Sequence, residues 1–158
     1  MKTDNVILKQ TKDFALRIIK LYQYLNDDKK EYVLSKQILR SGTSIGANVR
    51  ESENAQSRAD FVNKLNIALK EANETEYWLE LLHESSYISS KQFESIYADN
   101  GRIVGTLVKN NKDNKAALLN LSISQYLNIS ISQSLNLSIS QSLNISISQY
   151  LNDKRKWN

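Results

Sequence analysis

The chain has 158 residues with a formal net charge of +4 at pH 7, and it contains no proline, no cysteine and one histidine. This composition excludes a disulfide framework and both thiolate and multi-histidine metal sites, while the absence of proline favours long helices. No run of about 18 apolar residues is present and the N-terminus lacks the apolar core of a signal peptide, so we expect a cytoplasmic protein without a membrane span.

The first two predicted helices carry apolar residues at helical spacing. The first begins after an N-cap at Thr3 or Asp4 and ends in the polar segment 26–30. Its predicted core residues are Ile7, Phe14, Ile18, Leu21 and Leu25. The second begins near Ser35. Its predicted core residues are Ile38, Ser41, Ile45, Val49 and Ser52. Gly42 and Gly46 lie four residues apart in it. Because glycine weakens a helix interior, we expect a neighbouring helix to approach closely there.

The third predicted helix has core residues at alternating steps of four and three, which is typical of a left-handed bundle. These residues are Phe61, Leu65, Ala68, Ala72, Thr75, Leu79 and Leu82. Segments 57–60 and 89–92 resemble capping boxes that start the third and fourth helices. The predicted core residues of the fourth helix are Phe93, Ile96, Asn100, Ile103 and Leu107. We expect this helix to fray in segment 110–114. Short connections between helices of similar length predict an all-α, antiparallel up-down-up-down four-helix bundle over residues 3–115.

Residues 116–158 form a predicted low-complexity repeat extension with a basic end. Residues 121–152 hold four copies of an eight-residue repeat: LSISQYLN, ISISQSLN, LSISQSLN and ISISQYLN. Apart from one glutamine per copy, odd positions are leucine or isoleucine and even positions are serine, asparagine or tyrosine. Strict alternation indicates a strand, so stacked β structure or self-association is one interpretation. The simpler interpretation is an extension without function, and the leucine and glutamine content also leaves a helix open.

Motifs for catalysis are missing from the sequence. It has no glycine-rich phosphate loop, and Glu80-Leu-Leu-His83 is its one Glu-x-x-His segment. Di-metal sites in helical bundles use two such segments on facing helices. We therefore predict no catalytic residue, no metal, no cofactor and no enzymatic activity.

Two lines of residues lie away from the predicted core, and we expect them to contact other subunits. They are Arg40, Ser44, Asn48 and Glu51 on the second helix, and Ile67, Glu71, Glu74, Trp78 and Leu81 on the third. Apolar and aromatic residues interleaved with carboxylates favour a buried contact. The arginine and glutamate lines would pair between subunits. The alternatives are that the third helix lies deep in its own bundle and that the second presents a solvated polar face.

Basic residues form the second candidate surface. They are Lys9, Lys12, Arg17 and Lys20 on the first helix, with Arg50, Arg58 and Lys64 around the turn between the second and third helices. Such patches attract backbone phosphates without a sequence motif. In a ring of subunits the patches would repeat and their fields would add. For a single subunit, an ordinary solvated face is an equal alternative.

Segment 37–51 resembles a motif of the four-helix-bundle family of proteins encoded in 23S rRNA intervening sequences. The matching residues are Gln37, Arg40, Ser44, Ile45, Asn48, Val49 and Glu51. A second block resembles the third helix of the family. It runs from Arg58 to Phe61 and continues through Leu65, Ala68, Glu71 and Glu74. The resemblance covers about residues 4–112. The chain departs from the family in its Glu51-Ser52 pair, where the usual pair is Glu-Gly, and in the repeat extension.

The resemblance implies an antiparallel four-helix bundle that assembles as a ring, typically a pentamer, with no known enzymatic activity. A related branch, the accessory variability determinant of diversity-generating retroelements, is a basic pentamer that binds nucleic acid and a reverse transcriptase. We therefore expect a non-enzymatic homo-oligomer that binds RNA or DNA through its basic surfaces. The alternative is a scaffold that recruits a protein partner without nucleic acid.

Overall fold

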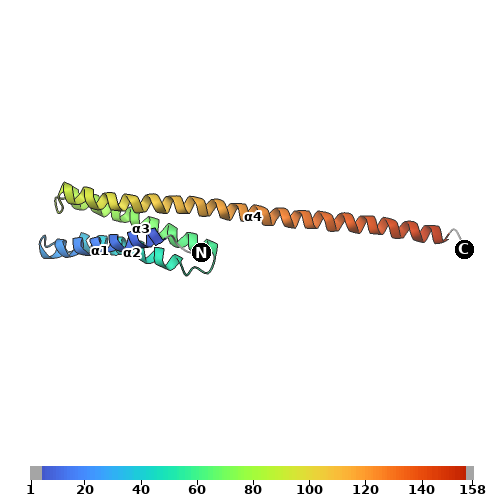
Figure 1. The fold of residues 1–158 in the computed structure, drawn as a ribbon, viewed down its shortest axis with the longest axis horizontal. Helices are drawn as coiled ribbons and strands as arrows, with labels where there is room; N and C mark the ends of the chain where they lie inside the picture. Colours follow the sequence, from blue (N-terminus) through green and yellow to red (C-terminus); the bar gives the residue numbers. More distant parts are fainter. Residues whose placement is uncertain (1–4, 156–158) are drawn as a thin grey trace. The chain divides into compact units, whose positions relative to one another are not determined.

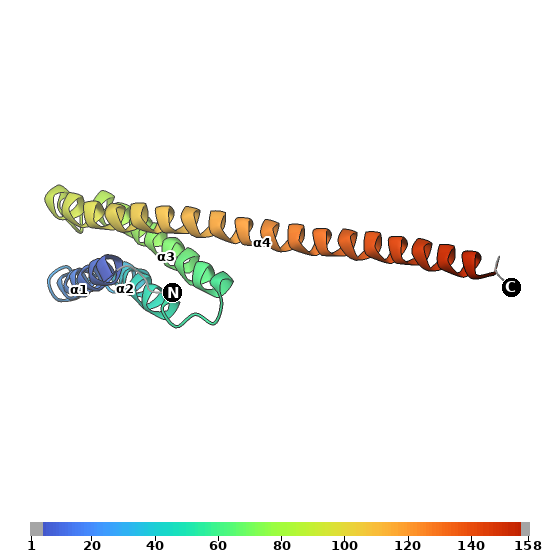
Figure 2. The ribbon, with the colours of Figure 1, turned by 45° about the vertical axis from the view of Figure 1, so that its right-hand side comes forward.

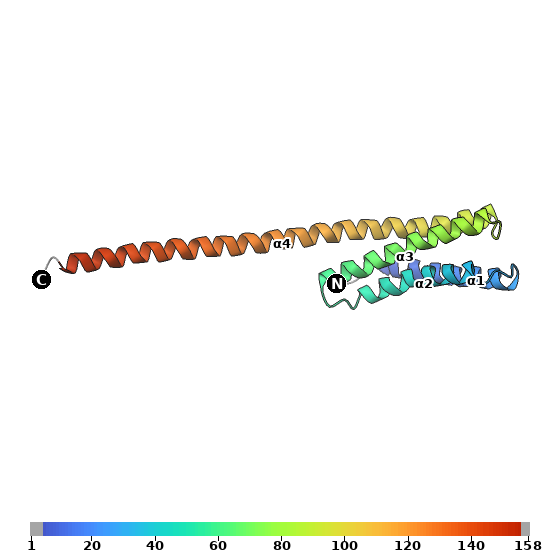
Figure 3. The ribbon, with the colours of Figure 1, turned by 180° about the vertical axis from the view of Figure 1, so that it is seen from behind.

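The computed structural model describes residues 5–155, which form four helices. These are α1 (Asn5–Asp27), α2 (Leu34–Ser52), α3 (Arg58–Glu84) and α4 (Ser90–Arg155). The chain divides into two units, Met1–Ala116 and Ala117–Asn158. In the first unit the helices pack in chain order as an up-down bundle, with α1 beside α2 and α3 beside the first part of α4 (Figure 1, and from behind in Figure 3). The predicted N-caps Thr3 and Asp4 lie outside the described residues.

The predicted core residues of α1, α2 and α3 are all buried. On α4, Ile96, Asn100, Ile103 and Leu107 are buried as predicted. Phe93 is half-buried instead, and its ring stacks on His83 with 4.6 Å between the centroids. It lies in the first turn of α4, and the Tyr97 ring covers another part of it with 4.8 Å between the centroids. The helical spacing of apolar residues therefore identified the core almost completely.

The close approach predicted at the two α2 glycines is confirmed. A Cβ atom at Gly42 would lie 2.7 Å from Ile18 Cγ1 and 2.9 Å from Cγ2, so α1 packs directly on the α2 backbone. At Gly46 a Cβ atom would lie 3.4 Å from the Thr11 carbonyl oxygen. The missing side chains let α1 and α2 lie closer together than two ordinary helices do.

The predicted capping box at 89–92 is complete, and the one at 57–60 is modified, because the Asp60 carboxylate reaches the residue before the N-cap. The Asp60 N–H donates to Ser57 Oγ at 3.1 Å, while the Asp60 carboxylate accepts from the Gln56 N–H at 3.2 Å. At the start of α4, the Ser89 N–H donates to Gln92 Oε1 at 2.9 Å and the Gln92 N–H donates to Ser89 Oγ at 3.3 Å. These bonds satisfy backbone donors that have no partner within the helix.

The N-terminus of α2 is capped by a residue that the sequence did not reveal. The Glu31 carboxylate accepts from the N–H groups of Val33, Leu34 and Ser35 at 2.9, 2.8 and 2.6 Å. Glu31 is only 7% exposed. Burial raises its pKa, but the three backbone donors more than offset this effect, so the pKa lies below its ordinary value. Its negative charge also complements the positive end of the α2 dipole.

The expected end of the fourth helix is wrong, and in the single chain the repeat is a helix and not a strand. The structure assigns Ser90–Arg155 to α4, and the repeat residues 121–152 are helical (Figure 2). No glycine or proline occurs after Gly105 to stop a helix. Serine hydroxyls in the repeat donate to carbonyls three or four residues earlier, as Ser122 does to Leu118 at 3.0 Å. A helix satisfies its backbone within one segment, whereas a strand requires a partner.

Candidate nucleic-acid and subunit interfaces

The two lines predicted as subunit contacts lie on adjoining helices. Thr75 Oγ1 donates to Ser41 Oγ at 3.0 Å in the buried seam between α3 and α2. Farther along, Lys64 Nζ lies 2.6 Å from Glu51 Oε2. These contacts fix the antiparallel register of α2 and α3. The register brings the Arg40 to Glu51 line and the Ile67 to Leu81 line to neighbouring positions in one protomer.

The charges of the two lines interact within the protomer. Burial and the Glu74 carboxylate raise the pKa of Glu71, and the Arg40 guanidinium opposes this change, so that the pKa of Glu71 remains raised. The ion pair with Glu51, first through its hydrogen bond and then through its charge, raises the pKa of Lys64. Arg40 and Glu51 therefore already have oppositely charged neighbours in their own chain.

Aromatic and aliphatic side chains on α3 form a half-buried strip beside these charges, here called the α3 strip. Ile67, Trp78 and Leu81 are each half-buried. Trp78 Nε1 donates to Glu74 Oε1 at 3.1 Å, and the Tyr77 ring lies 5.1 Å from the Trp78 ring. Tyr77, which sequence analysis missed, is 53% exposed. Side chains of this type are enriched at the centres of protein interfaces.

Two of the predicted basic residues meet at a groove between α1 and α2. Lys12 and Arg50 are exposed, and they line a cavity of about 350 Å³. The remaining lining residues are Leu8, Thr11, Ala15, Thr43, Gly46 and Ala47. None of the described residues that line this groove is acidic, so both cations face it without a neutralising partner. Lys20 is also exposed. Within residues 5–155, no ion pair involves Lys12, Lys20 or Arg50.

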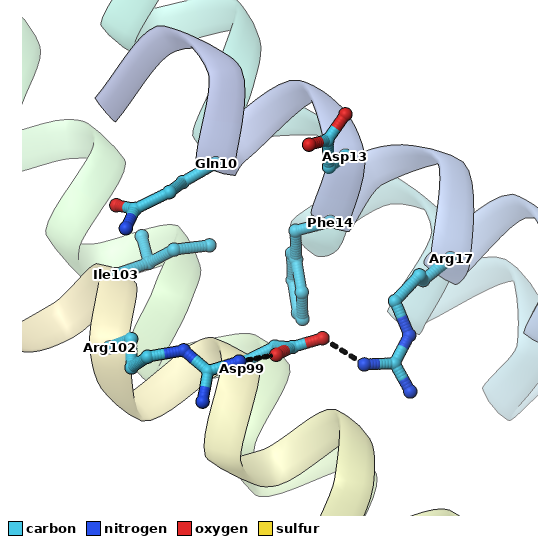
Figure 4. Close-up of a pocket in the computed structure, with 7 residues that line it drawn as sticks. All are labelled: Gln10, Asp13, Phe14, Arg17, Asp99, Arg102 and Ile103. Atoms are coloured by element: carbon cyan, nitrogen blue, oxygen red, sulfur yellow. Dashed lines mark hydrogen bonds and ion pairs between the residues drawn. The ribbon is translucent and has the colours of Figure 1, made fainter. Parts of the chain in front are cut away.

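Arg17 lies at a different place and is neutralised. Its guanidinium pairs with Asp99 of α4 and donates to Ser95 O at 3.2 Å and Ser95 Oγ at 2.9 Å. Figure 4 shows Arg17 and Arg102 reaching the same Asp99 carboxylate from opposite sides. The pocket around them has a volume of about 170 Å³. This cluster joins α1 to α4, so the main role of Arg17 is to hold these two helices together, and its charge is paired with Asp99.

The other three predicted basic residues also have partners in the chain. Lys9 pairs with Asp13 one turn along α1 at 2.6 Å. Arg58 Nη2 donates to Asn114 Oδ1 at 2.6 Å, and Lys64 pairs with Glu51. Of the seven predicted basic residues, Lys12, Lys20 and Arg50 therefore retain the most available charge, since an exposed, unpaired cation attracts phosphate most directly.

A second cluster between α3 and α4 was not predicted. Tyr97 Oη donates to Glu80 Oε1 at 3.4 Å. A hydrogen bond to Glu76, with burial and the charges of both glutamates, raises the pKa of Tyr97 to about 12. The spacing of Glu76 and Glu80 on one face of α3 was a visible signal. Its partner on α4 was not, because the register of the two helices is a tertiary property.

Two further properties concern the described residues as a whole. Within residues 5–155, no group of three or more acidic or histidine side chains is placed to hold a metal ion. No helix over the same range is both long enough and apolar enough to cross a membrane.

Comparisons with known proteins agree with the resemblance found in the sequence. The model of the 23S rRNA-intervening sequence protein family matches residues 3–109. A crystal structure of a protein of unknown function from the S23 ribosomal protein family of Bacteroides thetaiotaomicron is similar, with 60% sequence identity and a TM-score of 0.67. That match covers 67% of this chain and 98% of the other. No curated protein matches. The family model spans most of the chain, which therefore belongs to the 23S rRNA-intervening sequence protein family.

Proposed function

We propose that this protein is a non-enzymatic homo-oligomer that binds RNA through the groove between α1 and α2. The proposal rests on the positions of Lys12 and Arg50, which both line this groove. None of the described residues that line the groove is acidic. Two cations held on rigid helices offer fixed contacts for successive phosphates. The small side chains of Ala15 and Ala47 in the lining leave space for a nucleic-acid backbone to approach the two cations.

Salt dependence separates phosphate contacts from other kinds of binding. Each phosphate contact on a single strand contributes about 0.7 to the slope of log affinity against log salt. We expect the double variant Lys12→Ala, Arg50→Ala to bind a labelled single-stranded RNA more weakly and with a shallower slope, by roughly 1.4 for two lost contacts. Fluorescence anisotropy across a salt series measures both quantities. A duplex DNA arm tests whether the groove accepts either nucleic acid.

The matched control is Lys91→Ala, Lys109→Ala, which removes two exposed cations from α4 outside the groove. This variant should retain nearly all of the salt slope. The proposal fails if the unmodified protein binds no RNA at low salt. It also fails if the two double variants lose affinity equally, because the charge of the whole protein would then explain the binding.

The homo-oligomer is supported by the α3 strip. Ile67, Trp78 and Leu81 are covered only in part by their own chain, and a second subunit would complete their burial. A pentamer is the state that the family resemblance implies. Light scattering of the intact protein at several concentrations tests for assembly, and Trp78→Glu should reduce the assembled mass. A monomer at high concentration would refute the oligomer.

A protein-recruiting scaffold is the second candidate, and the exposed Tyr77 beside Trp78 favours it. Aromatic residues with an adjacent carboxylate are suited to a partner with a basic, apolar surface. A protein that stays bound after nuclease treatment, and that is lost in Tyr77→Ala, would support this candidate over RNA binding.

A further inference from the structure

The repeat segment exposes apolar side chains on all sides of its helix. Eleven leucine and isoleucine residues from Leu121 to Ile147 are each between 48% and 62% exposed. The second unit contains only this helical segment among its described residues, so nothing within the unit buries them. The sequence also has no charged residue between Lys115 and Asp153. So large an apolar surface without charges is unusual for a segment that remains alone in water.

A helical partner would not cover this surface well. At about 100° per residue, a repeat of eight residues advances by two turns plus roughly 80°, so equivalent leucines point in different directions in successive copies. A coiled coil requires apolar residues every 3.5 residues along one seam. The leucine and isoleucine residues of the repeat follow one another at steps of two and four, which spread around the helix and form no such seam.

An extended conformation places the apolar and the polar residues of the repeat on opposite faces of the segment. Alternation places every leucine and isoleucine of the repeat on one face, together with one glutamine per copy. Serine, asparagine and tyrosine occupy the other face. Serine, asparagine and isoleucine are also only moderate helix formers, so the intrinsic preference for the helix is small.

We propose that repeat segments from separate copies of this chain pair as in-register β-strands, building a cross-β stack while the bundles stay folded. The occupant of the apolar surface is therefore a second copy of the same segment. Stacked identical strands place leucine on leucine and form ladders of Gln125 and Asn128 and of their equivalents in each copy. A shift by one whole repeat keeps every residue on its face, so several registers are productive.

The composition supports self-pairing over capture of a different protein. Charged residues and proline are the usual features that prevent strands from stacking between copies. The repeat contains neither, and the nearest charges, Lys115 and Asp153, lie outside it. The Ser and Asn face supplies hydrogen bonds between neighbouring strands instead of the specific charges that would select a foreign partner.

The test uses the full chain and two insertions after Asn136, between the second and third copies. One inserted serine transfers the apolar residues of the last two copies to the opposite face, whereas two inserted serines restore the original alternation. Both changes leave composition and helix propensity nearly unchanged. Thioflavin T fluorescence follows assembly, far-UV circular dichroism follows loss of helix, and fibre diffraction tests for the strand spacing near 4.7 Å.

We expect the unmodified chain and the two-residue insertion to assemble with similar lag times and to show the strand spacing. The one-residue insertion should assemble several-fold more slowly. Equal lag times for the two insertions would overturn the proposal, as would assemblies that remain fully helical. A concentrated solution that stays free of assemblies through prolonged, seeded incubation would also overturn it.

Discussion

Substitution of Gly42 by alanine measures how tightly α1 packs on α2. The new Cβ would lie 2.7 Å from Ile18 Cγ1 and 2.9 Å from Cγ2, and both atoms belong to the branched base of a fully buried side chain. They cannot swing away, so the helices must separate. Overpacking of this kind costs about 1–3 kcal/mol, while replacing glycine in a helix interior gains about 1 kcal/mol. We expect a net loss of about 0–2 kcal/mol in the free energy of unfolding.

Gly105→Ala is the matched control, because a Cβ atom at Gly105 would meet nothing within 4 Å. Gly105→Ala gains the higher helix propensity of alanine without a steric clash. The free energies of unfolding of the two variants should therefore differ by the full overpacking cost of about 1–3 kcal/mol. At about 4 °C per kcal/mol for a unit of this size, their melting temperatures should differ by about 4–12 °C. Differential scanning calorimetry of the intact chain measures this difference directly.

Equal melting temperatures for Gly42→Ala and Gly105→Ala would refute the close contact. A double-mutant cycle with Ile18→Ala sharpens the test. Removing both Cγ atoms of Ile18 leaves space for the methyl group, so Gly42→Ala should be less harmful in that background, with a coupling above about 0.5 kcal/mol. A coupling near zero would mean that the cost arises elsewhere on α2.

Three further predictions concern other parts of the chain. Glu31→Gln should destabilise the bundle by about 1–2 kcal/mol at neutral pH, since three backbone donors lose a charged acceptor. Because the pKa of Glu31 is lowered in the folded protein, its stabilising effect is present above the ordinary pKa of 4.5 and is lost as the pH falls through the pKa of the folded state. Urea unfolding should therefore show that the difference in unfolding free energy between the unmodified protein and Glu31→Gln becomes smaller in acid. Tyr97 should ionise near pH 12, so Tyr97→Phe should remove a step near that pH from an ultraviolet absorbance titration; an unchanged titration near pH 12 in Tyr97→Phe would contradict the contact with Glu76 and Glu80. Removal of residues 117–158 should leave the bundle transition within about 0.5 kcal/mol, measured by calorimetry, and a collapse of the transition would show that the bundle depends on the extension.

Sequence reasoning succeeded where one helix determines the outcome by itself. Burial of Ile7, Ile45 and Leu65 follows from apolar spacing, and the Ser89–Gln92 capping box follows from two residues at a fixed separation. It missed Glu31 because that carboxylate reaches forward from the preceding turn, where no standard capping position exists. Helix capping is readable only when the cap adjoins the helix.

Contacts between helices were less accessible to prediction. The pairing of Lys64 with Glu51, and the sharing of Asp99 by Arg17 and Arg102, depend on the relative register of helices. Sequence analysis had placed Lys64 and Glu51 on separate functional surfaces. In the repeat the local pattern itself was misleading. Its alternation predicts a strand, but a strand in a single chain has no partner for its backbone hydrogen-bonding groups. The helix prevails within one chain.

The repeat also has a genetic consequence. Eight residues correspond to a unit of 24 nucleotides, so the gain or loss of one unit during replication leaves the reading frame intact. Each such event changes the helix by about 12 Å of length, at 1.5 Å per residue. Chains from closely related genes should therefore share the same bundle and differ in length by multiples of eight residues, which makes this segment a site where the protein's length can evolve in discrete steps.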